Sequence, residues 1–392
     1  MEQSGITTPQ PNKIDNLESK RLVGCQGELN LLIIEYLEET ADVYDITVPD
    51  TSNFYANDIL VHNCTEILST TKPLKHIFDE EGEISLCTLA AINWGVIKIE
   101  DFEKVCRLIV NFLDSLLSYQ EYPIAAARVN TMNRRQLGVG IINFAYWMAK
   151  NGFTYDNVSD EALAEIHRWA EAWSYHMIKA SNDLAIERGA CPKSDETKYS
   201  LGQVPIDTYK KDVDDLVPPV YYMPWDELRA NLKIHKVRNS TLMAGMPSET
   251  SSQISNSTNG IEPVRALVSV KQSKDGVSKQ VVPEIRKYKN KYDLLWEMKS
   301  PVGYLKIMAV LTKFIDQAIS INTSYNPQNY EGGEIPMSEL LNHLILCYKW
   351  GLPTAYYFNT YDGAGEIEME AVVEEAPEVA DDYDEPCDSC VL

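Results

Sequence analysis

Hydrophobic and polar positions recur with two different periods along the central part of the chain. Residues 101–119, 160–188 and 303–322 place apolar side chains at helical spacing, which predicts long helices. Residues 86–89 and 354–358 are short β-type runs between such stretches. Strands that alternate with helices are typical of α/β folds with parallel strands. The pattern therefore predicts a parallel barrel or a parallel sheet.

The N-terminal part has a different pattern, made of short β-type runs. Residues 30–37 are mostly apolar and predict a buried strand, and residues 43–48 alternate like a second strand. A Pro-Asp turn signal follows. Residues 59–61 predict another short strand, which ends directly before His62 and Asn63. We expect this part to be a small all-β unit.

The C-terminal segment Glu366–Leu392 is acidic, and no Lys or Arg follows Lys349. Such a segment cannot bury enough apolar surface to fold, so it predicts a disordered tail. A tail of about 30 residues reaches roughly 30 Å. It carries the pair Cys387 and Cys390. This spacing could be half of a zinc site, but no second half follows, and a redox thiol pair fits better.

Composition limits the possible functions. The chain has 392 residues, 44% of them hydrophobic, which is enough for a large core. The net charge of −23 argues against direct nucleic-acid binding. No run of 18 apolar residues and no secretory signal is present, so we expect a cytoplasmic protein without a membrane span. No metal site is predicted. The remaining cysteines are expected to be core or incidental thiols, and they are Cys25, Cys106, Cys191 and Cys347.

The tripeptide His62-Asn63-Cys64 can support cleavage of the chain. The Asn63 amide can attack its own backbone carbonyl and break the peptide bond to Cys64. The Cys64 thiol can first accept an acyl chain as a thioester. His62 has an intrinsic pKa suited to general acid and base catalysis. Taken alone, the tripeptide is a weak signal.

With the preceding strands, residues 43–63 closely resemble the C-terminal end of an intein. Ser52 stands where many inteins carry a helper histidine, so the resemblance implies full dependence on His62. Only 63 residues precede Cys64, which is too few for a complete intein. We therefore interpret residues 1–63 as the C-terminal fragment of a split intein. A gene fragment left by insertion or misassembly is the alternative.

From residue 64 onward, the chain carries a series of motifs: Cys64-Thr-Glu66, Ser85–Asn93, Asn133–Tyr146, Met246–Pro263 and Tyr356-Tyr357. Taken in order, they resemble the C-terminal half of the large subunit of class I ribonucleotide reductases. The resemblance is greatest to the bacterial and phage enzymes. It implies the second half of a ten-stranded α/β barrel over residues 64–365 and a redox tail over residues 366–392.

The resemblance also implies roles for particular residues. Cys64 would form the thiyl radical that takes hydrogen from the ribose, and Glu66 would be the base for a ribose hydroxyl. Cys87 would be one of two thiols that reduce the sugar, its partner lying on the missing half. Tyr356 and Tyr357 would relay the radical to Cys64.

Two further sites follow from the same resemblance. A hydroxyl-rich loop, in a turn that leads into a helix, would bind the substrate diphosphate. Cys387 and Cys390 would reduce the active-site disulfide and be recharged by thioredoxin or glutaredoxin. The loop consists of Pro247, Ser248, Glu249, Thr250 and Ser251.

Each assignment has a simpler alternative. Cys87 in an apolar strand would ordinarily be a buried core thiol. The Ser/Thr-rich loop could be a helix cap or an ordinary loop. Adjacent tyrosines such as Tyr356 and Tyr357 mostly pack, and in a strand they point to opposite faces.

The resemblance finally implies partners. Expected are the N-terminal half of the large subunit bearing an N-intein, a metal-containing small subunit that supplies the radical, and a ribonucleoside diphosphate. No cofactor is expected on this chain, and ATP/dNTP effector sites would lie on the missing half. The chain alone should be inactive until it is trans-spliced. The alternative function is a protein-splicing element that carries an inactive reductase fragment.

Overall fold

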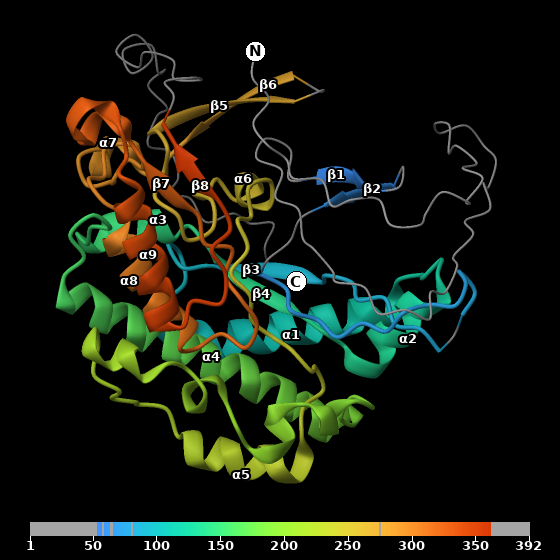
Figure 1. Ribbon diagram of the computed structural model, residues 1–392. Coiled ribbons are helices and arrows are strands. Elements are labelled where there is room, and N and C mark those ends of the chain that lie inside the picture. The colour runs from blue at the N-terminus through green and yellow to red at the C-terminus, as the bar shows by residue number, and fades with distance from the viewer. Residues whose placement is uncertain (1–52, 57–58, 63–65, 80, 274–275, 362–392) are drawn as a thin grey trace, which may run out of the picture.

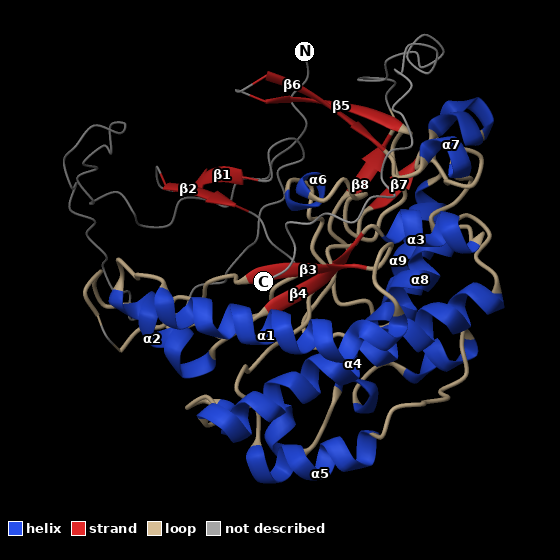
Figure 2. Cartoon of the chain, turned by 180° about the vertical axis from the view of Figure 1, so that it is seen from behind, coloured by secondary structure: helices blue, strands red, loops and turns tan. Residues whose placement is uncertain are grey.

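The computed structural model describes residues 53–56, 59–62, 66–79, 81–273 and 276–361. Within these residues, the strands form two parallel pairs, which isolated parallel bridges join into one ladder, and two antiparallel hairpins. Most of the helices lie on one side of the ladder, and the hairpins lie on the other (Figures 1 and 2). This arrangement confirms the predicted mixed α/β content. A closed ten-stranded barrel is not tested by the described part of the chain.

The sheet begins with two adjacent parallel strands. Strand β3 (Leu89–Asn93) pairs in parallel with β4 (Gly138–Ile142), and every residue of β4 is buried. The next strand in the ladder runs through residues 241–245, where Val139 pairs with Met243. Helices connect these strands in the sequence, as a parallel sheet requires.

The ladder continues in chain order. Gly245 pairs in parallel with Ile319, and the Tyr356 N–H donates to the Ile321 carbonyl at 2.8 Å. Strand β7 (Thr323–Tyr325) then pairs in parallel with β8 (Phe358–Thr360). Strand segments that follow one another in the sequence are therefore neighbours in the ladder. This order favours short connections and the same handedness at each crossover between strands.

Two hairpins lie on the side of the sheet away from most of the helices (Figure 1). Strands β1 (Asn53–Ala56) and β2 (Ile59–His62) pair antiparallel. Strands β5 (Val268–Ser273) and β6 (Gly276–Val281) form the second antiparallel pair. Strand β2 confirms the strand predicted at residues 59–61.

The helices occupy the connections between strands, and short 3-10 turns join several of them. Helices α1 and α2 separate β3 from β4, and α9 precedes β8. The helices are α1 (Phe102–Tyr119), α2 (Ala125–Arg134), α3 (Phe144–Asn151), α4 (Asp160–Arg188), α5 (Trp225–His235), α6 (Ser251–Ile254), α7 (Ile285–Tyr288), α8 (Val302–Thr312) and α9 (Met337–Trp350).

Helix α4 shows why the sequence sets its ends. Ser159 is the N-cap, and its Oγ accepts a hydrogen bond from the Ala162 N–H at 3.1 Å. Asp160 opens the first turn, where a negative charge is favourable. Gly189 follows the last residue with φ of +85°. The predicted helix at residues 160–188 is confirmed.

Aromatic side chains join the sheet to the helices. Trp94 directly follows β3 and is fully buried. Its ring lies 6.0 Å from Phe102 of α1, 5.8 Å from Trp147 of α3 and 6.3 Å from Trp173 of α4, measured between ring centroids. These rings contribute apolar burial and edge-to-face contacts at the point where three helices meet the sheet.

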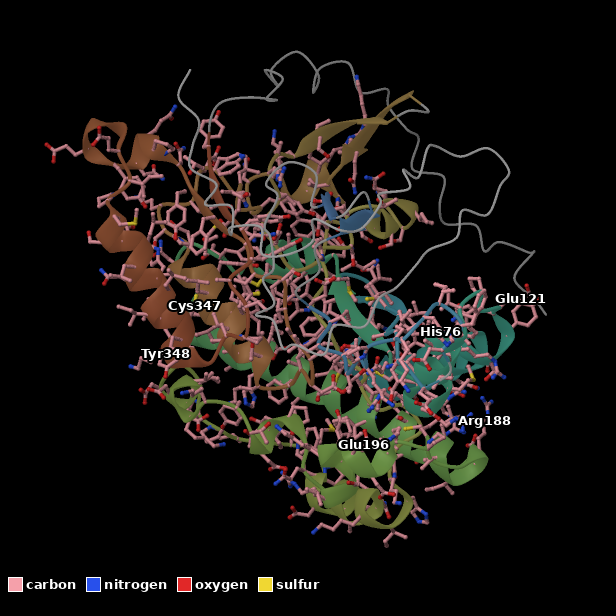
Figure 3. All side chains as sticks on the ribbon, turned by 45° about the vertical axis from the view of Figure 1, so that its right-hand side comes forward. His76, Glu121, Arg188, Glu196, Cys347 and Tyr348 are labelled. Carbon is pink, nitrogen blue, oxygen red and sulfur yellow. The ribbon has the colours of Figure 1, made fainter. Side chains whose placement is uncertain are left out.

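The buried carboxylate of Asp114 links helix α1 to basic side chains from other parts of the chain. Asp114 of α1 accepts from Arg135 Nε at 2.5 Å and from Arg238 Nε at 3.2 Å. Arg188, at the end of α4, is a third cationic neighbour at 3.5 Å (Figure 3). Removing Asp114 would leave two buried or partly buried guanidinium groups without their carboxylate, which is costly.

The predicted helix at residues 303–322 is wrong in its second half. Helix α8 ends at Thr312, and the chain then joins the parallel ladder. The Asp316 carboxylate accepts the backbone N–H groups of Leu242 and Met243, both at 2.8 Å. These bonds tie residues 313–321 to the neighbouring strand, so tertiary pairing replaces the helical bonds that the sequence pattern suggested.

The strand predictions are displaced by a few residues. The run predicted at residues 86–89 becomes β3 only from Leu89, and the run at residues 354–358 becomes β8 only from Phe358. The strands predicted at residues 30–37 and 43–48 lie outside the described residues, as does the tail at residues 366–392.

Candidate active site

Glu66 is a buried carboxylate at the sheet, with only 7% of its surface exposed. The Ser320 hydroxyl donates to Glu66 Oε2. The Glu66 carbonyl accepts from the Ala318 N–H at 3.0 Å. Both contacts come from the strand that pairs with Gly245. Backbone and side chain together therefore fix this carboxylate against the parallel ladder.

The segment after Glu66 lies close to β4 because β4 has a glycine there. A Cβ atom at Gly138 would stand 2.8 Å from Ile67 Cδ1 and 2.7 Å from Leu89 Cδ2. Both distances are shorter than van der Waals contact allows. Gly138 is thus the point where the Glu66 segment, β3 and β4 meet.

Cys87 lies just before β3, in an exposed position. The Thr88 carbonyl next to it accepts from the Gly138 N–H at 2.9 Å. The alternative that Cys87 is a buried core thiol is therefore wrong. Since Gly138 also contacts the side chain of Ile67, the Cys87 and Glu66 segments approach the same residue of β4.

The predicted phosphate-binding loop follows the strand at residues 241–245. Ser248 has φ of +54°, and its carbonyl accepts from the Ser252 N–H at 3.1 Å. Helix α6 then begins at Ser251, as the turn-to-helix prediction requires. Thr250 is at the N-cap but makes no capping bond with its side chain. The alternative of a helix cap thus has no support at Thr250.

The tight path of this loop depends on a second glycine. Gly260 has φ of +38°, and a Cβ atom there would lie 2.9 Å from the carbonyl oxygens of Met246 and Pro247. Any larger residue would push on the loop backbone. The loop itself is half-buried to exposed, so its hydroxyl groups are accessible at the carboxyl end of a parallel strand.

Tyr356 and Tyr357 face each other instead of pointing to opposite faces. Their ring centroids are 4.0 Å apart, and the Tyr357 hydroxyl donates to the Tyr356 oxygen at 3.2 Å. Both residues are half-buried. The expectation that adjacent residues alternate across a strand is wrong here, because regular β8 begins only at Phe358.

The sequence did not single out two residues that contact these groups. Ser320 donates to Glu66, and Asn322 Oδ1 accepts from the Tyr357 N–H at 3.2 Å. Their signal was the alternation Ile319-Ser320-Ile321-Asn322, which is typical of a strand. The helical spacing upstream hid it.

Several predicted residues lie outside the described part of the chain: Asn63, Cys64, Cys387 and Cys390. His62 is the last residue of β2, where it pairs with Asn53. The predicted roles of these residues in splicing, radical chemistry and thiol exchange therefore stay predictions.

The other described cysteines are buried. Burial raises the pKa of Cys191 and of Cys347 to about 11, and raises that of Cys106 further. On α9 the contrast between neighbours is clear, since Cys347 is buried while Tyr348 is exposed (Figure 3). Such thiols are unreactive. The prediction that these three are core thiols is confirmed.

The residues that the structure describes contain no group of three or more His, Cys, Asp or Glu side chains that could hold a metal ion. Among the helices that the structure describes, none is both long and apolar enough to cross a membrane.

Residues 33–358 match the family described as ribonucleotide reductase, barrel domain. The chain is 51% identical over 306 residues to the ribonucleoside-diphosphate reductase subunit alpha of Haemophilus influenzae, covering 78% of this chain and 40% of that protein.

Two further relatives carry similar names. The ribonucleoside-diphosphate reductase 1 subunit alpha of Escherichia coli is 50% identical over 266 residues, covering 68% of this chain and 34% of the relative. The ribonucleoside-diphosphate reductase subunit alpha of enterobacteria phage T4 is 37% identical over 376 residues, covering 94% of this chain and 49% of the relative. The chain thus spans less than half the length of these relatives.

The family match also bears on the N-terminal segment. It begins at residue 33 and so includes part of the predicted intein fragment. These comparisons give the intein prediction no support. By the match over residues 33–358, the chain belongs to the ribonucleotide reductase barrel-domain family.

Proposed function

We propose that this chain is the C-terminal part of a ribonucleoside-diphosphate reductase large subunit. It would act in deoxyribonucleotide synthesis, in the cytoplasm, once joined to an N-terminal half. The observation that carries this proposal is the setting of Glu66. Its carboxylate is buried against the parallel ladder by Ser320, and the loop at residues 247–251 leaves the strand next to that of Ser320. The relatives' names support the same reaction class.

The chemistry would start at Cys64. Its thiyl radical would take a hydrogen atom from the ribose, and Glu66 would accept a proton from a ribose hydroxyl. A second hydroxyl would then leave as water. Cys87 and a thiol on the upstream half would supply two electrons and two protons and become a disulfide. Cys64 would then return the hydrogen atom to the ribose and become a thiyl radical again. The exposed position of Cys87 supports this role, because a buried thiol could not reach a substrate.

The diphosphate of the substrate would bind at Pro247, Ser248, Glu249, Thr250 and Ser251. Hydroxyl groups and backbone N–H groups would donate to the phosphate oxygens. The position of the loop after a parallel strand supports this proposal, since ligands of open α/β sheets bind at carboxyl ends of strands.

Tyr356 and Tyr357 would carry the radical from a metal-containing small subunit to Cys64. Their hydroxyl contact of 3.2 Å supports this proposal, because a proton can move along it when an electron leaves the ring. Outside the described residues, Cys387 and Cys390 would reduce the active-site disulfide and be recharged by thioredoxin or glutaredoxin.

The edge of the sheet at β3 supports a missing half. Leu86 is 37% exposed and Leu89 is 41% exposed, and within the described part of the chain β3 pairs in a strand ladder only with β4. An edge strand with exposed apolar side chains is normally covered. The N-terminal half of the large subunit, with its ATP/dNTP effector sites, would continue the sheet there.

Substitution of Cys87 tests the reductase function. In the joined enzyme with its small subunit, Cys87→Ser should lose deoxyribonucleotide formation even in a single turnover, because that thiol reduces the sugar directly. Product would be measured by rapid quench, and Cys191→Ala, which removes a buried thiol, is the matched control. Normal product from Cys87→Ser would refute the assignment.

The second candidate is protein splicing. The observation that favours it is the β1–β2 hairpin, which ends at His62, directly before Asn63. We propose that residues 1–63 are an intein C-terminal fragment. Its partner would be an N-intein on the upstream half of the large subunit. The chain would then be a reductase only after trans-splicing.

A further inference from the structure

Tyr357 has an unusual backbone partner. The Tyr356 N–H donates to the Ile321 carbonyl, and the Tyr357 carbonyl accepts from the Thr323 N–H at 2.9 Å, both as in a parallel ladder. The Tyr357 N–H instead donates to a side chain, Asn322 Oδ1, at 3.2 Å. The neighbouring strand therefore holds Tyr357 through a side chain as well as through its backbone.

This contact coincides with the departure from strand geometry. Regular pleating would place the rings of Tyr356 and Tyr357 on opposite faces. Their centroids are instead 4.0 Å apart. The hydrogen bond to Asn322 Oδ1 thus acts on the peptide group between Tyr356 and Tyr357. The orientation of this peptide group decides whether the two rings meet.

A carboxyl group orients the Asn322 amide. Asn322 Nδ2 donates to Glu262 Oε1 at 2.6 Å. An amide has a donor end and an acceptor end, so binding the NH2 to Glu262 turns Oδ1 toward the Tyr357 N–H. Burial raises the pKa of Glu262, with the Asn322 bond lowering it. In either protonation state, a carboxyl oxygen can accept from the amide.

Glu262 is itself fixed by the fold. The carbonyl of Ile261, the preceding residue, accepts from the Tyr155 hydroxyl at 3.1 Å. Two residues further on, the Val264 carbonyl accepts from the Leu295 N–H at 2.8 Å. Glu262 and Asn322 also line one small pocket with the buried Tyr304. The carboxyl group therefore has little freedom to follow a moving amide.

We propose that Glu262 and Asn322 are positioning residues for the tyrosine pair. Glu262 orients the Asn322 amide, and Asn322 holds the Tyr357 peptide so that both rings lie together. This inference rests on the proposed radical relay through Tyr356 and Tyr357. It means that two residues outside the relay set the ring geometry on which the relay depends.

Hydrogen exchange of the full chain tests the contact without catalysis. Asn322→Ala should speed exchange of the peptide that contains Tyr357 by about tenfold, because one net hydrogen bond is lost. Glu262→Leu should do the same, whereas Glu262→Gln should not, because its amide oxygen still accepts. Asn326→Ala is the matched control, since Asn326 donates to the Trp296 carbonyl and not to this pair.

Turnover of the joined enzyme tests the consequence. Asn322→Ala and Glu262→Leu should lower kcat by about tenfold or more with unchanged KM for substrate, because the reacting rings are misplaced and the substrate site is not. Glu262→Gln and Asn326→Ala should keep normal kcat. A Glu262→Gln enzyme as impaired as Glu262→Leu would overturn the proposal.

The two measurements separate the possible failures. Unchanged exchange in Asn322→Ala would show that the contact does not hold Tyr357, which overturns the inference whatever the activity. Faster exchange with normal kcat would overturn the positioning role while leaving the reductase function intact. A joined wild-type enzyme without reductase activity would refute the proposed function and the relay role together.

Discussion

At the scale of single residues, the structure places polar groups where the parallel strands need partners. The Asp316 carboxylate, for example, accepts from the N–H groups of Leu242 and Met243 and from the Tyr199 hydroxyl at 2.8 Å. It thereby fixes the strand that leads to the predicted phosphate loop. Burial is the largest influence on this carboxyl and raises its pKa to about 6.

The raised pKa of Asp316 predicts a pH dependence of stability. Between roughly pH 4 and pH 7 the folded state binds more protons at this site than the unfolded chain, whose Asp pKa is about 3.9. The free energy of unfolding should therefore fall as the pH rises through this range. Denaturant unfolding of wild type and Asp316→Asn isolates the contribution.

The stability difference between these two proteins should change with pH. The advantage of wild type over Asp316→Asn should be larger at pH 5 than at pH 7, by about 1 kcal/mol. A difference that stays constant between the two pH values would show that the Asp316 carboxyl does not titrate there in the folded state.

The tyrosine pair gives a second residue-scale prediction. Tyr356→Phe or Tyr357→Phe should abolish turnover of the joined enzyme and leave substrate binding intact. Phenylalanine keeps the ring packing but has no hydroxyl to lose a proton. Steady-state turnover and equilibrium nucleotide binding are the measurements, with the exposed Tyr119→Phe on α1 as control. Retained activity would make these rings ordinary packing residues.

At the scale of elements, the pairing of short strands decides which residues of the candidate site become neighbours. The strand of Ser320 and the loop after Gly245 are neighbours only because Gly245 pairs with Ile319. Glycine is needed where a second segment crosses β4, since Gly138 has no space for a Cβ beside Ile67. These short elements bring residues from distant parts of the sequence next to one another.

The predicted role of the C-terminal tail can be tested separately from the chemical step on the substrate. The double substitution Cys387→Ser and Cys390→Ser should spare a single turnover and block repeated turnover with thioredoxin or glutaredoxin as reductant. The tail acts only through thiol exchange in this proposal. A small dithiol such as dithiothreitol should restore repeated turnover by reaching the active-site disulfide directly.

Single-turnover and multiple-turnover assays distinguish the outcomes for the tail. Loss of the first turnover in the double variant would place these thiols in the chemical step itself. Many turnovers on the protein reductant alone would show that the tail is not needed for thiol exchange.

At the scale of the whole molecule, the chain corresponds to less than half of its relatives. Helices cover one side of its parallel sheet (Figure 2). Among the described residues, β3 is an edge strand, and the apolar side chains of Leu86 and Leu89 are exposed there. A sheet of this kind is complete when both its faces and its edges are covered. The proposed N-terminal half would supply that cover.

Splicing is the prediction that belongs to this scale. Mixing this chain with a matching upstream half that bears an N-intein should yield a joined product lacking residues 1–63. Asn63→Ala should trap a branched or unspliced species, because Asn63 can no longer cyclise. Intact mass spectrometry is the measurement. Unchanged joining in the Asn63→Ala chain would eliminate the proposed cleavage chemistry.

The sequence by itself determined much of the local structure. The helical spacing located α4, and the mixed order of helices and strands indicated parallel α/β architecture. The turn predicted at residues 247–251 leads into a helix, which is α6. Local patterns succeed at these places because short-range hydrogen bonds and capping decide the conformation.

Only the tertiary structure decided how the site is assembled. It converted residues 318–321 from a predicted helix into a strand, and so brought Ser320 to Glu66. It turned Tyr356 and Tyr357 toward each other, with a hydrogen bond from the Tyr357 N–H to Asn322 Oδ1. The physical reason is the same in both cases. Pairing with a strand far away in the sequence replaces local hydrogen bonds, and no local pattern records which distant partner will be adjacent.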